Sequence, residues 1–131
     1  MRTRVKICCI ASSAEARAAA VAGTDVVGLV GPMPTGPGAI TLEAARTIAA
    51  RAPVGVTPVL LTALTDGEAI AAEALSAGVP VVQIVRHVLA DAHAAIREAA
   101  PSLRILQVVH VETRPPSTSP APTPRPATRS C

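Results

Sequence analysis

A short apolar run that leads directly into a capped helix limits most strongly how this chain can fold. The run is Val5-Lys6-Ile7-Cys8-Cys9-Ile10, and its β-branched residues favour a strand. Ser12 and Glu15 follow at the spacing of a capping box, which predicts a helix start. A strand followed at once by a helix is the first half of a βα unit. Because side chains alternate along a strand, we expect Cys8 to be accessible and Cys9 to lie in the core.

The same pattern of strand and helix recurs to about residue 112. We expect helices at 13–22, 42–52, 66–77 and 89–100, and strands at 4–10, 25–30, 55–62, 79–85 and 103–111. Capping residues mark the helix ends, namely Thr41, the Thr65-Asp66-Gly67-Glu68 capping box, Gly23 and Gly78. Residues 22–30 and 77–85 form a weak internal repeat. Helices between successive strands imply right-handed crossovers, so the sequence predicts an α/β fold with about five parallel strands and four helices.

Composition supports a packed domain and argues against several functions. Half of the 131 residues are hydrophobic and none is aromatic, so the core must be aliphatic. The net charge is only +3, and without aromatic residues there is no platform for stacking bases, which argues against nucleic-acid binding. No segment is long and apolar enough to span a membrane. Three cysteines, two of them adjacent, match neither a disulfide framework nor a zinc site, so we expect no metal, no cofactor and a cytoplasmic location.

The composition changes abruptly after Glu112. Residues 113–131 are rich in Pro, Ser, Thr and Ala, and their charged side chains are Arg114, Arg125 and Arg129. Such a segment buries too little surface to offset the entropy of ordering, so we expect a disordered tail after a domain at 1–112. Either the tail is native, or the βα pattern stops because the chain is a truncated or frameshifted copy of a longer fold.

Three segments together carry a resemblance to a known family. They are Arg4-Val5-Lys6-Ile7-Cys8, Ala22-Gly23-Thr24-Asp25-Val26-Val27-Gly28-Leu29-Val30 and Val81-Val82-Gln83-Ile84. They resemble the first, second and fourth strands of phosphoribosylanthranilate isomerase, a family that opens with Lys-Ile-Cys-Gly. That family is a (βα)8, TIM-type barrel of tryptophan biosynthesis. The resemblance covers residues 3 to about 112 and therefore implies a partial (βα)8 barrel.

The resemblance also implies an isomerase reaction, the Amadori rearrangement of N-(5-phosphoribosyl)anthranilate. This chemistry needs a general acid at the ribose ring oxygen and a general base at the second sugar carbon. In the family the base is a cysteine thiolate, which falls on Cys8, and the acid is an aspartate at the end of strand six. Lys6, Gln83 and Arg86 are candidate residues for binding the phosphorylated sugar–anthranilate substrate, with Arg86 as a replacement for the family's carboxylate-binding arginine.

Several positions depart from the family pattern. Cys9 stands where the family has Gly, Gly38 stands where it has the carboxylate-binding arginine, and Val85-Arg86 replaces His-Gly. Strands six to eight, with the catalytic aspartate and the phosphate-binding loops, have no counterpart in the sequence. We therefore expect a chain that is inactive alone. The alternative is a non-catalytic binding module, whose open sheet edges would favour self-association or pairing with another chain.

The candidate residues also have purely structural interpretations. Cys8 could be a small buried hydrophobic residue, and Gln83 could satisfy backbone groups. His87 and His110 lie near expected strand ends and could act as acids or bases, although surface or core roles are more common. Glu112 could replace the missing acid, but it borders the Pro-rich segment.

Overall fold

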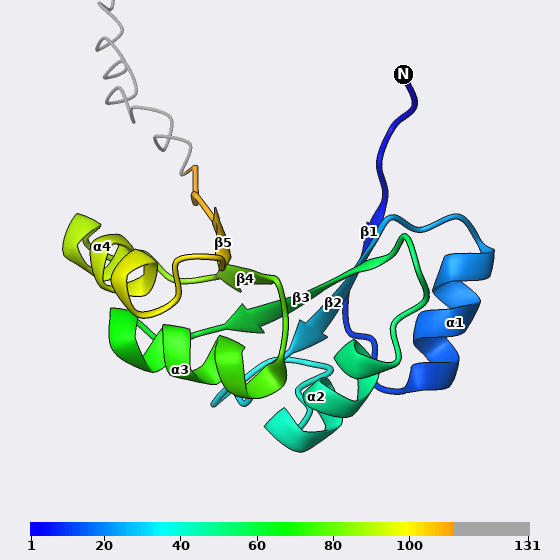
Figure 1. Cartoon of the computed structure of the whole chain (residues 1–131), viewed down its shortest axis with the longest axis horizontal. Helices are drawn as coiled ribbons and strands as arrows, with labels where there is room; N and C mark the ends of the chain where they lie inside the picture. Colours follow the sequence, from blue (N-terminus) through cyan, green and yellow to red (C-terminus); the bar gives the residue numbers. More distant parts are fainter. Residues whose placement is uncertain (112–131) are drawn as a thin grey trace, which may run out of the picture.

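Strands and helices alternate throughout residues 1–111, the part of the chain that the computed structural model describes (Figure 1). The strands are β1 (Lys6–Ile7), β2 (Val26–Val30), β3 (Thr57–Thr62), β4 (Val81–Ile84) and β5 (Arg104–Gln107). The helices are α1 (Ser13–Val21), α2 (Leu42–Ala50), α3 (Gly67–Ala77) and α4 (Ala90–Ala99). The predicted order of elements is confirmed, although every strand is shorter than predicted. The predicted tail at 113–131 and the domain boundary at 112 lie outside the described residues.

The five strands form one parallel sheet in the order β1-β2-β3-β4-β5. Each strand therefore lies beside its neighbour in sequence, as in a (βα)8 barrel wall. The register pairs Lys6 with Val26 in β2, and Leu61 of β3 with Gln83 of β4. The order and the register confirm the predicted partial barrel, of the same architecture as the family that the sequence resembles.

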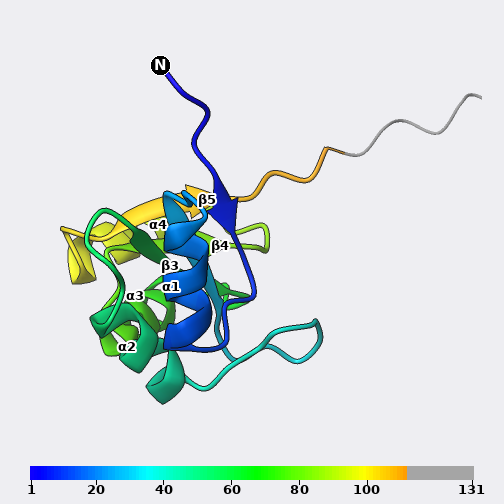
Figure 2. The same ribbon diagram turned by 90° about the vertical axis from the view of Figure 1, so that its right-hand side faces the viewer.

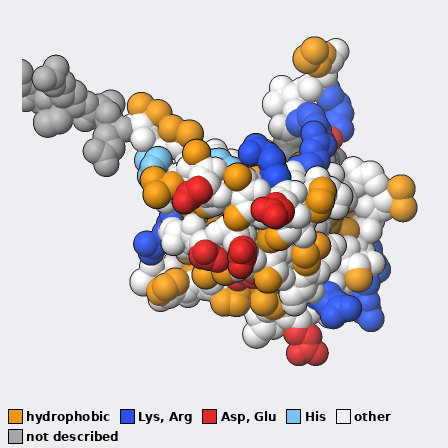
Figure 3. Space-filling model, turned by 60° about the vertical axis from the view of Figure 1, so that its left-hand side comes forward, with side chains coloured by type: hydrophobic (Ala, Val, Ile, Leu, Met, Phe, Trp, Pro, Cys, Tyr) orange, Lys and Arg blue, Asp and Glu red, His pale blue; other side chains and the backbone are white. Residues whose placement is uncertain are grey.

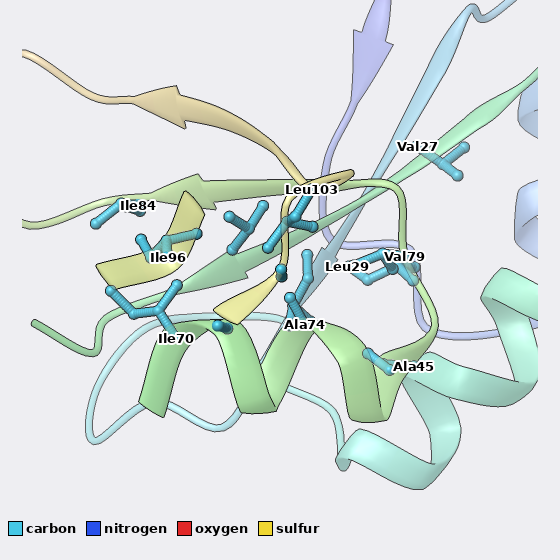
Figure 4. Close-up of a cluster of buried hydrophobic side chains, with 14 of the residues drawn as sticks. Val27, Leu29, Ala45, Ile70, Ala74, Val79, Ile84, Ile96 and Leu103 are labelled. Carbon is cyan, nitrogen blue, oxygen red and sulfur yellow. The ribbon is translucent and has the colours of Figure 1, made fainter. Parts of the chain in front are cut away.

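All four helices cover the same face of the sheet, so the two faces differ in burial (Figures 1 and 2). The main core lies between the sheet and the helices, where Leu29 of β2 and Ile84 of β4 meet Ile70 of α3 and Ile96 of α4 (Figure 4). The opposite face, here called the inner face, has a small core of Val30, Val59, Leu61 and Val81. Because Val82 and Ile84 point to the helices, Gln83 points to the inner face.

The helix starts follow the predicted capping chemistry, with one correction. Ser12 Oγ accepts a hydrogen bond from the Glu15 amide at 3.1 Å, and Glu15 reaches back to the Ala11 amide at 2.7 Å. At α3 the predicted capping box, with its cap at Thr65, is wrong. The cap is Asp66, whose carboxylate accepts from the Ala69 amide at 2.8 Å. A carboxylate at this position satisfies a free amide and interacts favourably with the helix dipole, so the helix begins one residue later.

Candidate active site

Three of the predicted site residues meet on the inner face of the sheet. Lys6 Nζ donates a hydrogen bond to Cys8 Sγ at 2.9 Å and another to Gln83 Oε1 at 2.7 Å. Lys6 and Cys8 lie two residues apart at β1, whereas Gln83 lies in β4. Cys8 follows the last residue of β1, at the carboxyl end of the strand, where α/β barrels place their chemistry. The cluster therefore joins a thiol, an ammonium group and an amide at this end of the sheet.

A glycine in the neighbouring strand makes room for the thiol. A Cβ atom on Gly28 would lie 2.9 Å from Cys8 Sγ and 3.1 Å from Cys8 Cα. Any larger residue at this position would push the thiol away from the contact with Lys6. We did not single out Gly28 from the sequence, although a glycine inside a buried strand is a known sign of close approach by another group.

Arg86 is not part of this cluster. Its side chain is exposed in the loop that follows β4, and its carbonyl oxygen accepts a hydrogen bond from Gln107 Nε2 at 2.8 Å. The arrangement thus brings together Lys6, Cys8 and Gln83 and leaves Arg86 on the surface near the end of β4.

The predicted burial of Cys9 is wrong. Both Cys8 and Cys9 are exposed free thiols, and Ile10 is the residue that enters the main core, with 5% of its surface exposed. The strand ends at Ile7, and Cys9 has a φ of +60°, so the alternation of a regular strand does not continue through the two cysteines. The burial of Cys9 was mispredicted because the sequence pattern overestimated the length of β1.

All three histidines of the chain line one hollow of about 460 Å³ at the carboxyl ends of β4 and β5. Gln107 Oε1 accepts from His93 Nε2 at 2.9 Å, and His110 Nε2 donates to the Val85 carbonyl at 3.0 Å. These hydrogen bonds restrain the imidazole rings of His93 and His110 against neighbouring groups of the protein. Neither His93 nor Gln107 was singled out by the sequence analysis, because their pairing joins a helix to a strand.

The acidic residues of the described part lie apart from the thiol. Within residues 1–111 no carboxylate is hydrogen bonded to Lys6, Cys8 or Gln83. Burial raises the pKa of Glu73 on α3, and a hydrogen bond from Thr62 opposes this shift more weakly. Glu112, the predicted alternative acid, lies outside the described residues. The geometry therefore shows a base candidate with a cationic neighbour, and no carboxyl group beside it in the described part.

Residues 1–111 were compared with the requirements of a metal site and of a membrane-spanning helix, and they meet neither. These residues contain no cluster of three or more His, Cys, Asp or Glu side chains placed to hold a metal ion. None of the helices described there has both the length and the apolar character needed to cross a bilayer.

Comparison with known proteins links this geometry to one family. No protein-family model matches the chain. The chain is 32% identical over 109 residues to N-(5′-phosphoribosyl)anthranilate isomerase 2 of Methanosarcina mazei. The matched region is 82% of this chain and 48% of that protein.

Solved structures agree with the sequence match. A phosphoribosyl anthranilate isomerase crystallised with reduced 1-(o-carboxyphenylamino)-1-deoxyribulose 5-phosphate superposes with a TM-score of 0.75 at 27% identity, over 85% of this chain and 55% of that chain. Monomers of the dimeric isomerase from Thermotoga maritima give a TM-score of 0.74 at 27% identity, over 86% of this chain and 56% of that chain. The chain thus spans about half the length of the relatives it matches. In sequence, strand order and architecture, it belongs to a phosphoribosylanthranilate isomerase-like family.

Proposed function

We propose that this chain carries the general-base half of a phosphoribosylanthranilate isomerase active site. The substrate class is a phosphorylated sugar–anthranilate, and the pathway is tryptophan biosynthesis. The observation that carries the proposal is the double hydrogen bond of Lys6, which joins Cys8, the residue at the family's base position, to Gln83. The exposed free thiols agree with a cytoplasmic, reducing location, which we also propose.

Each residue of the cluster has a defined part in this proposal. The Cys8 thiolate removes the proton from the second carbon of the opened sugar. The ammonium group of Lys6 stabilises negative charge on the sulfur through a charge-assisted hydrogen bond. Gln83 Oε1 accepts from the same ammonium group and so fixes its position.

The cluster also keeps donors free for the substrate. An ammonium group has three N–H donors, of which Lys6 uses two on Cys8 and Gln83. The Gln83 amide nitrogen makes no hydrogen bond within residues 1–111. These donors suit the oxygen-rich sugar, which is the substrate-binding role that we propose for Lys6 and Gln83. Arg86 follows β4 on an exposed loop, and we propose that its guanidinium group binds the anthranilate carboxylate.

The same arrangement leads us to propose that the chain alone isomerises the substrate very slowly. The reaction needs an acid and a base on one bound sugar, and the described residues place no carboxylic acid beside the base. Loss of one member of an acid–base pair typically costs on the order of 10²–10⁴ in rate. A chain that acts without the family's phosphate-binding loops would be slower still, because remote binding energy positions the reacting carbon.

Turnover of freshly made phosphoribosylanthranilate tests this proposal. The measurement is the loss of the substrate's anthranilate fluorescence above the background of spontaneous hydrolysis. We expect no rate above this background. Activity that is lost in Cys8→Ser but retained in Cys9→Ser would refute the proposed inactivity and would point to an acid such as His110 or Glu112.

Thiol labelling tests the base independently of turnover. We expect iodoacetamide to modify Cys8 several-fold more slowly in Lys6→Met and in Gln83→Leu, because the thiolate loses its ammonium neighbour or that neighbour loses its support. Labelling of Cys9, which has no contact with Lys6, is the internal control in the same sample. Unchanged labelling of Cys8 in Lys6→Met would remove Lys6 from the proposed base.

A non-catalytic interaction module is the second candidate function. It is favoured by the edge strands β1 and β5, each of which pairs on one side only within residues 1–111. Self-association through these edges would support this function if it persisted in Cys8→Ser, whose sheet edges are unchanged. A monomer at all concentrations would argue against self-association.

A further inference from the structure

The side chain of Gln107, in β5, connects neighbouring elements at the carboxyl end of the sheet. Its Nε2 atom donates to the Arg86 carbonyl at 2.8 Å and to the Val108 carbonyl at 3.0 Å, and the Ile84 carbonyl is a more distant acceptor at 3.4 Å. Its Oε1 atom accepts from Nε2 of His93, in α4, at 2.9 Å. One side chain thus joins β5 to the end of β4, to the loop that follows β4 and to α4.

The carbonyl groups around Gln107 determine which end of its amide faces which neighbour. A carbonyl oxygen only accepts hydrogen bonds, so the atom beside the Arg86 and Val108 carbonyls must be the amide nitrogen. The amide oxygen then faces His93, whose Nε2 atom must carry a proton in order to donate to it. These groups therefore fit together in one arrangement, with a proton on His93 Nε2.

The loop between β4 and α4, residues 85–89, is held on both sides of Arg86. The Val85 carbonyl accepts from His110 Nε2 at 3.0 Å, and Val88 is buried in the main core. Histidine side chains reach the surface at this end of the molecule, where they lie beside hydrophobic side chains (Figure 3). Together with the bond to the Arg86 carbonyl, these contacts fix the backbone of Arg86, although its side chain is exposed.

The guanidinium group of Arg86 is free to bind a ligand within the described structure. The one ion pair within residues 1–111 joins two other side chains, and Arg86 makes no side-chain hydrogen bond there. Gln83 lies in β4 and Arg86 in the loop that follows it, so both are at the carboxyl end of this strand. A guanidinium group binds a carboxylate best through two parallel hydrogen bonds, which require a defined direction. An anchored backbone reduces the entropy that such binding costs.

We propose that Gln107, with its amide oriented by His93, positions Arg86 for the carboxylate of the anthranilate ring and so makes the site select ligands that carry this group. The inference rests on the proposed isomerase function, in which Arg86 binds that carboxylate. Gln107 is a positioning residue, because it acts through the backbone of Arg86 and not on the ligand itself.

Two ligands that differ only in the carboxyl group measure this selectivity. One is reduced 1-(o-carboxyphenylamino)-1-deoxyribulose 5-phosphate, with which a related isomerase was crystallised, and the other is the same molecule without the carboxyl group. Calorimetric titration of the full 131-residue chain gives the ratio of the two affinities. We expect the carboxylate ligand to bind roughly tenfold more tightly, and Arg86→Gln to abolish this ratio.

The variant Gln107→Met tests the positioning. Methionine has a similar length but offers no N–H donor to the Arg86 carbonyl, so we expect the affinity ratio to fall several-fold while the carboxyl-free ligand binds as before. The matched control is Ser102→Met, which replaces an exposed polar residue before the opposite end of β5 and should leave the ratio unchanged.

Hydrogen exchange without ligand separates the positioning from the proposed function. We expect residues 85–89 to exchange several-fold faster in Gln107→Met than in the unaltered chain and in Ser102→Met, because the loop loses a hydrogen bond. Nitrogen NMR of the unaltered chain should show the His93 proton on Nε2. Circular dichroism confirms the fold of each variant, and the milder Gln107→Asn, which is too short to reach the Arg86 carbonyl, should give the same changes.

Each other outcome overturns a defined part of the argument. Unchanged exchange of residues 85–89 in both Gln107 variants removes the positioning by Gln107 and leaves the isomerase function standing. Equal weakening of both ligands shows that Gln107 supports the fold in general and does not set selectivity. An unaltered chain that binds the two ligands equally, or neither of them, removes Arg86 from the substrate site, and the selectivity assigned to Gln107 is then refuted with it.

Discussion

Cys9 adopts a backbone conformation that glycine adopts more easily, and its side chain packs on a glycine of the next loop. Its φ is +60°, and a Cβ atom on Gly38 would lie 2.8 Å from Cys9 Cβ. In the resemblance to the family, Cys9 stands in place of a glycine and Gly38 in place of an arginine. These two departures are therefore in contact, and the Cys9 side chain leaves no room for a larger residue at position 38.

We expect Cys9→Gly to stabilise the chain by about 0.5–1 kcal/mol. The left-handed conformation costs a non-glycine residue roughly 1–2 kcal/mol, and part of this gain is offset by the greater freedom of glycine in the unfolded chain. Urea unfolding of the two proteins measures the difference. Cys9→Ser is the control, because it removes the thiol and retains the Cβ atom. A loss of stability in Cys9→Gly would contradict the proposed strain.

The buried environment of Glu73 predicts that the stability of the fold depends on pH. Burial raises its pKa above the ordinary value of 4.5, and its Oε2 atom has no hydrogen-bond partner in the described structure. A carboxyl group whose pKa is raised by folding stabilises the fold below its unfolded pKa, and this contribution is lost as the pH rises through the folded pKa. We therefore expect Glu73→Gln to raise the melting temperature at about pH 7 and to have little effect at about pH 4.

The pKa of Asp25 is shifted in the opposite direction, so Asp25 serves as a control for the Glu73 melting experiment. Hydrogen bonds from Arg2 and from the Val5 amide lower the pKa of Asp25 below 3.8. Its contribution is therefore present above the unfolded pKa and lost as the pH falls through the folded value. Asp25→Asn should lower the melting temperature at about pH 7 and have less effect in acid. The same sign for both variants would contradict these environments.

At the scale of elements, α3 and α4 pack closely because a glycine begins α3. A Cβ atom on Gly67 would overlap the carbonyl oxygen of Ala92 and would lie 2.8 Å from the Cβ of Ala95. Gly67 is buried, and its φ is not in the left-handed region, so its small size is what this contact requires. Small alanine side chains let the helices approach one another closely, and glycine at this contact lets α3 approach α4 more closely still.

We expect Gly67→Ala to destabilise the chain by about 1–3 kcal/mol, because the added methyl group must separate α3 from α4. Chemical denaturation measures the loss. Ser76→Ala is the control, since Ser76 is exposed near the end of the same helix and should change stability by less than about 0.5 kcal/mol. An equal effect of the two substitutions would show that helix propensity, rather than the contact, determines the result.

At the scale of the whole molecule, the described residues form a main core between the sheet and the helices. Its buried members extend from Ile10 to Leu103, and they include residues of all four helices. The inner face has a much smaller core, whose buried members are Val30, Val59, Leu61 and Val81. The helical face thus holds the larger core, and the inner face holds the smaller one.

We propose that residues 1–112 are the folding unit, and we expect a chain ending at Thr113 to keep its circular dichroism spectrum and melting temperature. The reason is that the main core and its helices lie before that point. A chain ending at Pro101, which lacks Leu103 of the core and β5, is the comparison and should lose stability clearly. A marked loss in the longer variant would show that residues beyond 113 contribute to the fold.

The sequence by itself determined the order of elements, the helix ends to within two residues and the position of the candidate base. These features depend on residues close together in the chain: the β-branched run before Cys8, the Ser12 and Glu15 cap, and Gly78, whose φ of +65° ends α3. The tertiary structure decided the features that depend on pairing between strands. Lys6 and Gln83 are 77 residues apart and meet because the register of four strands places them on one face. The exposure of Cys9 was decided in the same way, because β1 pairs with β2 only as far as Ile7, and a local pattern does not show where pairing stops.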